Sequence, residues 1–240
     1  MINPVGEVSS FVRAALVMPV ARDHHESDAA FRRRRVVAVI TLVVGTVALT
    51  LALRIPPGDS AFYLATAGLA LVWTIGAFAS GPLHLGRART RSGGDARPIV
   101  QSLALGALLL AVFLLGGAVI AHIPFLRDPV STLLDHARLG SLPVVAVLTA
   151  VNGISEELYF RGALYSAVGR RNAVLVTTLV YALTTVGSGI PLLVLAAGLL
   201  GLLTGLQRRV TGGILGPVIT HLTWSLGMLF LLPTVLSSGS

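Results

Sequence analysis

Two adjacent carboxylates and an arginine interrupt a long apolar run of the sequence. Glu156, Glu157 and Arg161 lie within the run 142–168. An ionisable group at the centre of a membrane costs at least about 2.5–3.5 kcal/mol, so three of them within two helical turns need a reason. In a helix, Glu157 and Arg161 are four residues apart, share a face and can form an ion pair. Glu156 points about 100° away, which leaves it free to act as a general base.

A buried ion cluster that only fixes helix packing is the simplest alternative for these charges. A single pair of Glu157 and Arg161 would suit that alternative well. The second carboxylate, Glu156, adds a charge that the pair cannot neutralise, and such uncompensated groups are typical of functional sites. We therefore interpret Glu156 as a functional residue.

One histidine, His221, lies deep in another apolar segment, 212–232. Glu157 is 12 residues from Gly169, and His221 is 10 residues from Thr211. At about 1.5 Å per residue these positions are roughly 18 and 15 Å from the same side of a membrane, so the two side chains can meet at one level. Ser225 follows one turn after His221 on the same helix face, and Trp224 either lines the same cavity or simply packs.

The composition requires a membrane scaffold for these residues. Charged residues make up 12% of the 240-residue chain and hydrophobic residues 54%. A soluble domain needs a larger charged coat, and a disordered chain has far less apolar content, so both classes are excluded. The chain has no cysteine, which excludes disulfides, thiol catalysis and cysteine metal sites.

The apolar segments predict an all-α polytopic membrane protein with about seven transmembrane helices. A spanning helix needs roughly 20 mostly apolar residues. The segments are residues 36–53, 61–80, 99–123 and 142–168, two halves of 173–206 on either side of a turn at 187–191, and 212–232. We divide the chain into a cytoplasmic Arg-rich tail (1–35), three N-terminal helices with their loops (36–141), a membrane core of four spans (142–232) and a short C-terminal tail (233–240).

The arginines predict the orientation of the chain. All 18 basic residues are arginine; 14 lie in the tail and in the loops of one side, three (Arg54, Arg127 and Arg138) lie in loops of the other side, and Arg161 lies within a span. By the positive-inside rule the N-terminus is cytoplasmic. The net charge of +8 is then a signal of topology, and we exclude nucleic acid as a partner.

Three minor features have structural interpretations. We expect 9–20 to form a short interfacial helix and 133–139 to lie on the outer surface. His24 and His25 stand among acidic residues that suit a metal, but a solvated charged tail explains them more simply. The glycines at 198, 201 and 205 are spaced for close helix packing.

The motifs of residues 142–232 resemble the CPBP family, the CAAX-protease and bacteriocin-processing (Abi) group of intramembrane endopeptidases. Glu156-Glu157-x-x-x-Arg161 matches its first motif, and a glycine- and proline-containing segment leads into His221 as in its third. Two positions depart from the pattern. Thr185, four residues after Tyr181, stands where the second motif has histidine, and Ser225 stands where the third has asparagine.

The resemblance implies that Glu156 activates a water molecule to hydrolyse a peptide bond of a membrane-associated protein or peptide. Glu157 and Arg161 would hold that glutamate, while His221, with Ser225 as a weaker second donor, would stabilise the oxyanion. Losing one such group, as at Thr185, typically costs about 10²–10³-fold in rate. A divalent metal such as zinc has a poor ligand set here, because the site offers one histidine and two glutamates. The resemblance also leads us to expect the plasma (inner) membrane of a bacterium.

Two other functions remain open at this point. The replacement at Thr185 is consistent with a catalytically silent relative that binds membrane peptides or a partner protein. Glu156 and Glu157 are also consistent with a proton relay in a small transporter. Hydrolysis gained by Thr185→His would favour the first, and flux that follows a pH gradient would favour the second.

Overall fold

The computed structural model describes residues 4–20, 26–89, 94–169 and 171–237. The candidate metal ligands His24 and His25 lie outside the described residues. Arg22, Arg91 and Arg170, which belong to the predicted cytoplasmic side, also lie outside them.

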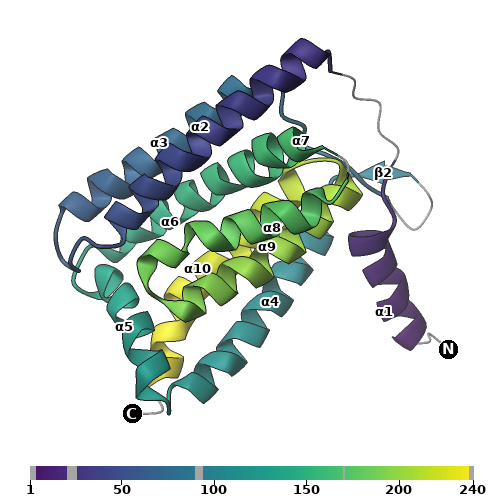
Figure 1. The fold of residues 1–240 in the computed structure, drawn as a ribbon. Helices are drawn as coiled ribbons and strands as arrows, with labels where there is room; N and C mark the ends of the chain where they lie inside the picture. The colour runs from purple at the N-terminus through teal and green to yellow at the C-terminus, as the bar shows by residue number, and fades with distance from the viewer. Residues whose placement is uncertain (1–3, 21–25, 90–93, 170, 238–240) are drawn as a thin grey trace.

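The described chain is almost entirely helical, and its long helices run back and forth along one axis (Figure 1). The elements are α1 (Pro4–Val12), a π-helix η1 (Arg13–Val17), α2 (Asp28–Ala52), α3 (Ala61–Ser80), α4 (Ile99–Ile120), α5 (Pro124–Arg138), α6 (Leu142–Glu157), a π-helix η2 (Leu158–Leu164), α7 (Tyr165–Val168), α8 (Ala173–Thr184), a 3₁₀ turn η3 (Val186–Ser188), α9 (Pro191–Thr211) and α10 (Leu215–Ser237). Two antiparallel strands of two residues each, β1 (Ala88–Arg89) and β2 (Asp95–Ala96), lie between α3 and α4. The predicted all-α polytopic fold is confirmed.

Fewer helices than the seven predicted spans are long and apolar enough to cross a membrane. Among the described residues, α2, α3, α4, α9 and α10 are long and apolar enough to cross a membrane, and the bent pair of α5 with 142–168 brings the number to six at most. The predicted span that falls short is α8, whose 12 residues extend only about 18 Å against a hydrocarbon core of about 30 Å. It still carries the chain from the end at Arg171 toward the start of α9 at the other end of the bundle.

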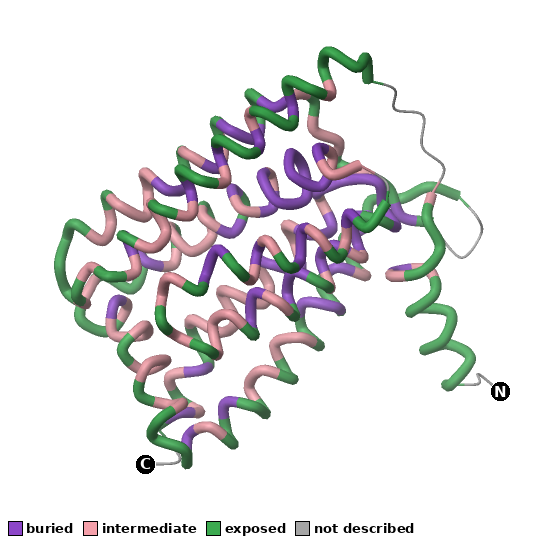
Figure 2. The backbone as a smooth tube through the Cα atoms, in the orientation of Figure 1, coloured by how far each residue is buried: buried purple, intermediate pink, exposed green. Residues whose placement is uncertain are grey.

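Many large apolar side chains are exposed on the outside of the bundle. The buried residues gather around η2 and the second half of α9 (Figure 2). Val39, Val43 and Val47 form an outward stripe on α2, each more than half exposed. In water such a surface would be unfavourable, whereas in a bilayer it faces lipid chains.

The described arginines separate between the two ends of the bundle as predicted. Eleven of them lie at the end where α2 and α4 begin and α9 terminates, namely Arg13, Arg32, Arg33, Arg34, Arg35, Arg87, Arg89, Arg97, Arg171, Arg208 and Arg209. The opposite end carries Arg54, Arg127 and Arg138. The first end is closed by backbone hydrogen bonds, including one from Arg87 to Thr211 in α9.

Two short segments differ from their predicted bounds. The segment 133–138 is part of the longer helix α5, where His136 is buried and bonds the carbonyl oxygen of Ile55 at 3.0 Å. The N-terminal helix begins at Pro4 rather than Ser9, and the chain after it pairs with α9 through a bond from Val20 to Val210.

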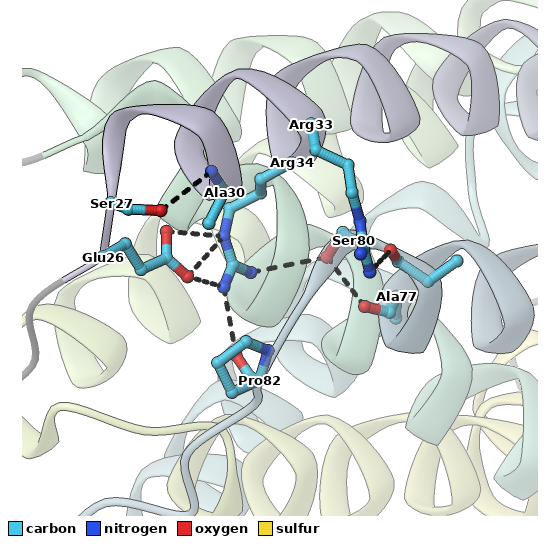
Figure 3. A network of polar contacts seen from close by, with 9 residues as sticks. Glu26, Ser27, Ala30, Arg33, Arg34, Ala77, Ser80 and Pro82 are labelled. Carbon is cyan, nitrogen blue, oxygen red and sulfur yellow. Dashed lines mark hydrogen bonds and ion pairs between the residues drawn. The ribbon is translucent and has the colours of Figure 1, made fainter.

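A buried arginine joins the start of α2 to the end of α3 (Figure 3). Arg34 is 1% exposed; its guanidinium donates to the Glu26 carboxylate at 3.1 Å, to Ser80 Oγ at 3.4 Å and to the carbonyl oxygen of Pro82 at 3.3 Å. Glu26, which belongs to the predicted cytoplasmic tail, is therefore bonded to the helical bundle.

We expect Arg34→Met to destabilise the protein by about 1–3 kcal/mol, because it leaves a carboxylate and a buried hydroxyl without their donor. The matched control is Arg32→Met, since Arg32 is exposed in the same helical turn. Its expected effect is within about 0.5 kcal/mol. Equal unfolding midpoints for the two variants in detergent would contradict this role of Arg34.

Candidate active site

The helix that carries the two glutamates is anchored to α3 before it reaches them. Asn152 donates to the carbonyl oxygen of Thr66 at 3.2 Å, and Thr74 donates to Ser155 Oγ at 2.9 Å. Directly after Glu157 the helix widens into the π-helix η2. Arg208 of α9 donates to the carbonyl oxygen of Arg161 within this turn at 2.7 Å. Such π-helical segments occur frequently at functional sites.

Glu157 forms a buried cluster with one arginine and one histidine. Its Oε1 lies 3.2 Å from Arg161 Nη1 and 2.8 Å from His221 Nδ1. Glu157 and Arg161 are fully buried, and His221 is 5% exposed. The expected i, i+4 ion pair is present, and α10 brings His221 to the same depth. The histidine meets this second carboxylate, so Glu157 fixes the imidazole through Nδ1 and leaves Nε2 for other partners.

Glu156 points about 100° away from Glu157 around the helix and lines a cavity of about 190 Å³. The cavity wall also includes Tyr181 and Thr185 of the α8 segment and His221 and Trp224 of α10. Its volume is enough for several water molecules at about 30 Å³ each. Glu156 is only half-buried, and its Oε2 accepts a hydrogen bond from the Tyr181 hydroxyl.

The two altered motif positions lie in different surroundings. Thr185 lines the cavity beside Glu156, but its hydroxyl donates to the carbonyl oxygen of Ala182 at 2.8 Å within its own helix. Ser225 lines a larger cavity of about 540 Å³ that adjoins the first at Leu193 and Trp224, and its buried Oγ has no hydrogen-bond partner among the described residues. The structure therefore brings Glu156, Thr185 and His221 to one cavity and places Ser225 on the wall of the neighbouring one.

Arg161 is held mainly by charge and by aromatic rings. Its guanidinium carbon lies 4.7 Å from the centre of the Tyr181 ring and 5.9 Å from that of Phe160, both within the range of cation–π attraction. Among the described residues, its three side-chain nitrogens have no partner of good hydrogen-bond geometry, and neither has Glu157 Oε2. The cluster is thus a buried ion pair whose hydrogen bonding is incomplete, an arrangement that resists the loss of either charge.

A metal ion does not fit this donor set. Within the described ranges, no three His, Cys, Asp or Glu side chains are grouped to hold one. Glu157 is engaged by Arg161 and His221, and the Nδ1 atom of His221 faces that carboxylate. Glu156 and a single imidazole nitrogen would remain, which is fewer than the three protein ligands of a catalytic zinc site.

Sequence reasoning did not identify Tyr181 as a functional residue. Its aromatic ring marked only the start of the altered second motif. The available signal was its hydroxyl group, on the same helix as Thr185 and one turn before it. Only the packing of α8 against η2, the segment directly after Glu157, shows that this hydroxyl reaches Glu156.

The close approach of α9 depends on a glycine beside this site. A Cβ atom at Gly201 would lie 3.2 Å from Tyr181 Cδ1 and 3.4 Å from Arg161 Nη2, whereas one at Gly198 would have no neighbour within 4 Å. We expect Gly201→Ala to be about 1–3 kcal/mol less stable than Gly198→Ala, because the tyrosine and arginine must shift. Chemical unfolding of both variants measures the difference, and equal stability would contradict this packing.

The fold and the site define an all-helical membrane protein with a paired-glutamate centre buried among its C-terminal helices. Residues 138–227 match a family model described as type II CAAX prenyl endopeptidase Rce1-like. This segment contains every residue of the candidate site, and its match confirms the resemblance to the CAAX-protease family that its motifs predict. The family that the segment resembles is one of endopeptidases. No curated protein and no solved structure matches the chain.

Proposed function

We propose that the chain is an intramembrane endopeptidase in which Glu156 activates the attacking water. The observation that carries this proposal is the half-buried Glu156 carboxylate on the wall of a cavity inside the segment matched by the CAAX-protease family. The adjacent Glu157 is neutralised by Arg161, so Glu156 is the carboxylate left for acid–base chemistry.

The proposed reaction needs one base and one oxyanion donor. Glu156 takes a proton from water as the water oxygen attacks the carbonyl carbon of the scissile peptide bond. His221, with Nδ1–H bonded to Glu157, donates through a protonated Nε2 to the developing oxyanion. The C–N bond then breaks, and Glu156 returns its proton to the leaving amine. Ser225 is not assigned a step in this scheme, since it lines the neighbouring cavity rather than the one that contains Glu156.

The position of the cavity supports the proposed kind of substrate, and the arginines support the proposed orientation in the membrane. The site is enclosed by helices whose outer surfaces are apolar, so we propose a membrane-associated protein or peptide as the substrate. The arginine-rich end of the bundle would face the cytoplasm by the positive-inside rule, with the bacterial plasma membrane as the proposed location.

A catalytically silent relative that binds membrane peptides is the second candidate. The observation that favours it is Thr185, whose hydroxyl is already bonded to Ala182 and can accept no proton at neutral pH. Hydrolysis that appears only in Thr185→His would support this candidate, because it would show a site lacking one group.

Cleavage of membrane-anchored peptides by the purified protein tests the proposal. The panel includes prenylated peptides in nanodiscs, with products identified by mass spectrometry in ¹⁸O-labelled water. From wild type we expect one ¹⁸O atom in the new carboxylate of the N-terminal product and none in the product that carries the new amine. The rate for Glu156→Gln should be far lower. Identical results for the two proteins across the panel would exclude the proposed endopeptidase activity.

A further inference from the structure

We propose that Tyr181 is a positioning residue that orients Glu156 through its phenolic hydroxyl. The inference rests on the proposed protease function and adds a residue to it. It names the group that supports Glu156 in this chain, in which position 185 is threonine rather than the histidine of the family motif.

The contact between the two residues is direct. The Tyr181 hydroxyl donates to Glu156 Oε2, and both side chains line the same cavity. The other carboxylate oxygen, Oε1, accepts no hydrogen bond from the described residues, and Glu156 is only half-buried. One oxygen is therefore anchored and the other is left to receive a proton from water. A phenol suits this anchoring role, because it stays protonated at neutral pH and donates a single hydrogen bond.

The tyrosine is itself held rigidly. Its ring packs against Phe160 with centroids 4.6 Å apart, and Arg161 lies 4.7 Å from its centre. Gly201 allows α9 to approach its edge. Arg161 thus supports both carboxylates, Glu157 by charge and Glu156 through the tyrosine ring. Such a preorganised support keeps a catalytic group in one geometry.

Tyr181 and Thr185 lie one turn apart and line the same cavity. The Thr185 hydroxyl is used within its own helix, so Tyr181 is the residue of this segment whose polar group reaches Glu156. An imidazole placed at residue 185 would extend into the cavity that Glu156 lines. This geometry predicts that a histidine there can replace the lost support when the hydroxyl is removed.

The test compares Tyr181→Phe with Tyr159→Phe in the nanodisc cleavage assay. Tyr159 is a buried tyrosine whose hydroxyl donates to the carbonyl oxygen of Ala38 at 2.6 Å, away from the cavity. Both changes remove one buried hydroxyl, and only the first removes a contact to Glu156. We expect Tyr181→Phe to lower kcat about 10- to 100-fold with KM within about twofold, and Tyr159→Phe to leave kcat of the folded protein unchanged.

Rescue separates positioning from a merely structural role. We expect Tyr181→Phe with Thr185→His to recover at least about tenfold of the lost kcat. A kcat for Tyr181→Phe equal to or above that of wild type would overturn this proposal alone, as would an equal loss in Tyr159→Phe. A wild type no faster than Glu156→Gln would instead overturn the protease proposal, and this one with it.

Discussion

Glu156→Gln is expected to lower kcat/KM about 10²–10⁴-fold, the usual contribution of a general base. The amide cannot take a proton from water, whereas it keeps the shape of the side chain. Its oxygen can still accept the Tyr181 hydroxyl that now bonds Glu156 Oε2. The unfolding free energy should therefore change by less than about 1 kcal/mol. Cleavage rates and unfolding midpoints measured on the same preparation test both parts.

The adjacent residue is the matched control for this prediction. Glu157→Gln removes the charge that faces Arg161 at 3.2 Å in a fully buried setting. Its main effect should be a loss of stability, since the arginine charge is left uncompensated. The two substitutions should thus have different effects: Glu156→Gln should lower the cleavage rate, and Glu157→Gln should lower the stability of the fold. Retention of full activity by Glu156→Gln would show that the assigned base is wrong.

Arg161→Met is expected to destabilise the protein by about 3–5 kcal/mol. Methionine fills much of the same space, so the dominant change is a buried Glu157 carboxylate without its cation. The substitution also removes the attraction between the guanidinium and the Tyr181 ring. Chemical unfolding in detergent micelles measures the loss.

Two variants identify the cause of that loss. Arg161→Met combined with Glu157→Gln removes both charges, keeps an oxygen that can accept from His221, and should recover most of the stability. Arg138→Met breaks an ion pair to Asp135 in which both side chains are more than a third exposed, and it should cost at most about 1 kcal/mol. A double variant as unstable as the single one would show that the unpaired carboxylate is not the cause.

The parts of the site that lie on one helix could be predicted from the sequence. Glu157 and Arg161 are four residues apart, and helical geometry alone brings them to one face and turns Glu156 away. The depth of His221 followed from counting residues along two helices, of which one ends and the other begins at the same side. The side of the bundle that carries each arginine followed from the alternation of apolar segments and loops.

Contacts between helices could not be predicted in the same way. The count placed His221 near the glutamates, but the structure decides that it meets Glu157 at 2.8 Å rather than Glu156. Likewise Ser225, one turn after His221, faces a different cavity. The length of α8 could not be predicted from the sequence either, because an uncharged run does not show where a helix within it ends.

The sequence by itself determined the class of fold, the charged residues that need a partner, and the pairing within one helix. Only the tertiary structure showed that the Tyr181 hydroxyl bonds Glu156 and that Ser225 lines the larger, neighbouring cavity. The physical reason is that lipid-facing and protein-facing positions of a membrane helix are both apolar, so hydropathy does not mark which face meets a neighbour. Rotation and crossing of the helices are set by close packing of side chains, which becomes visible only when all of them are in place.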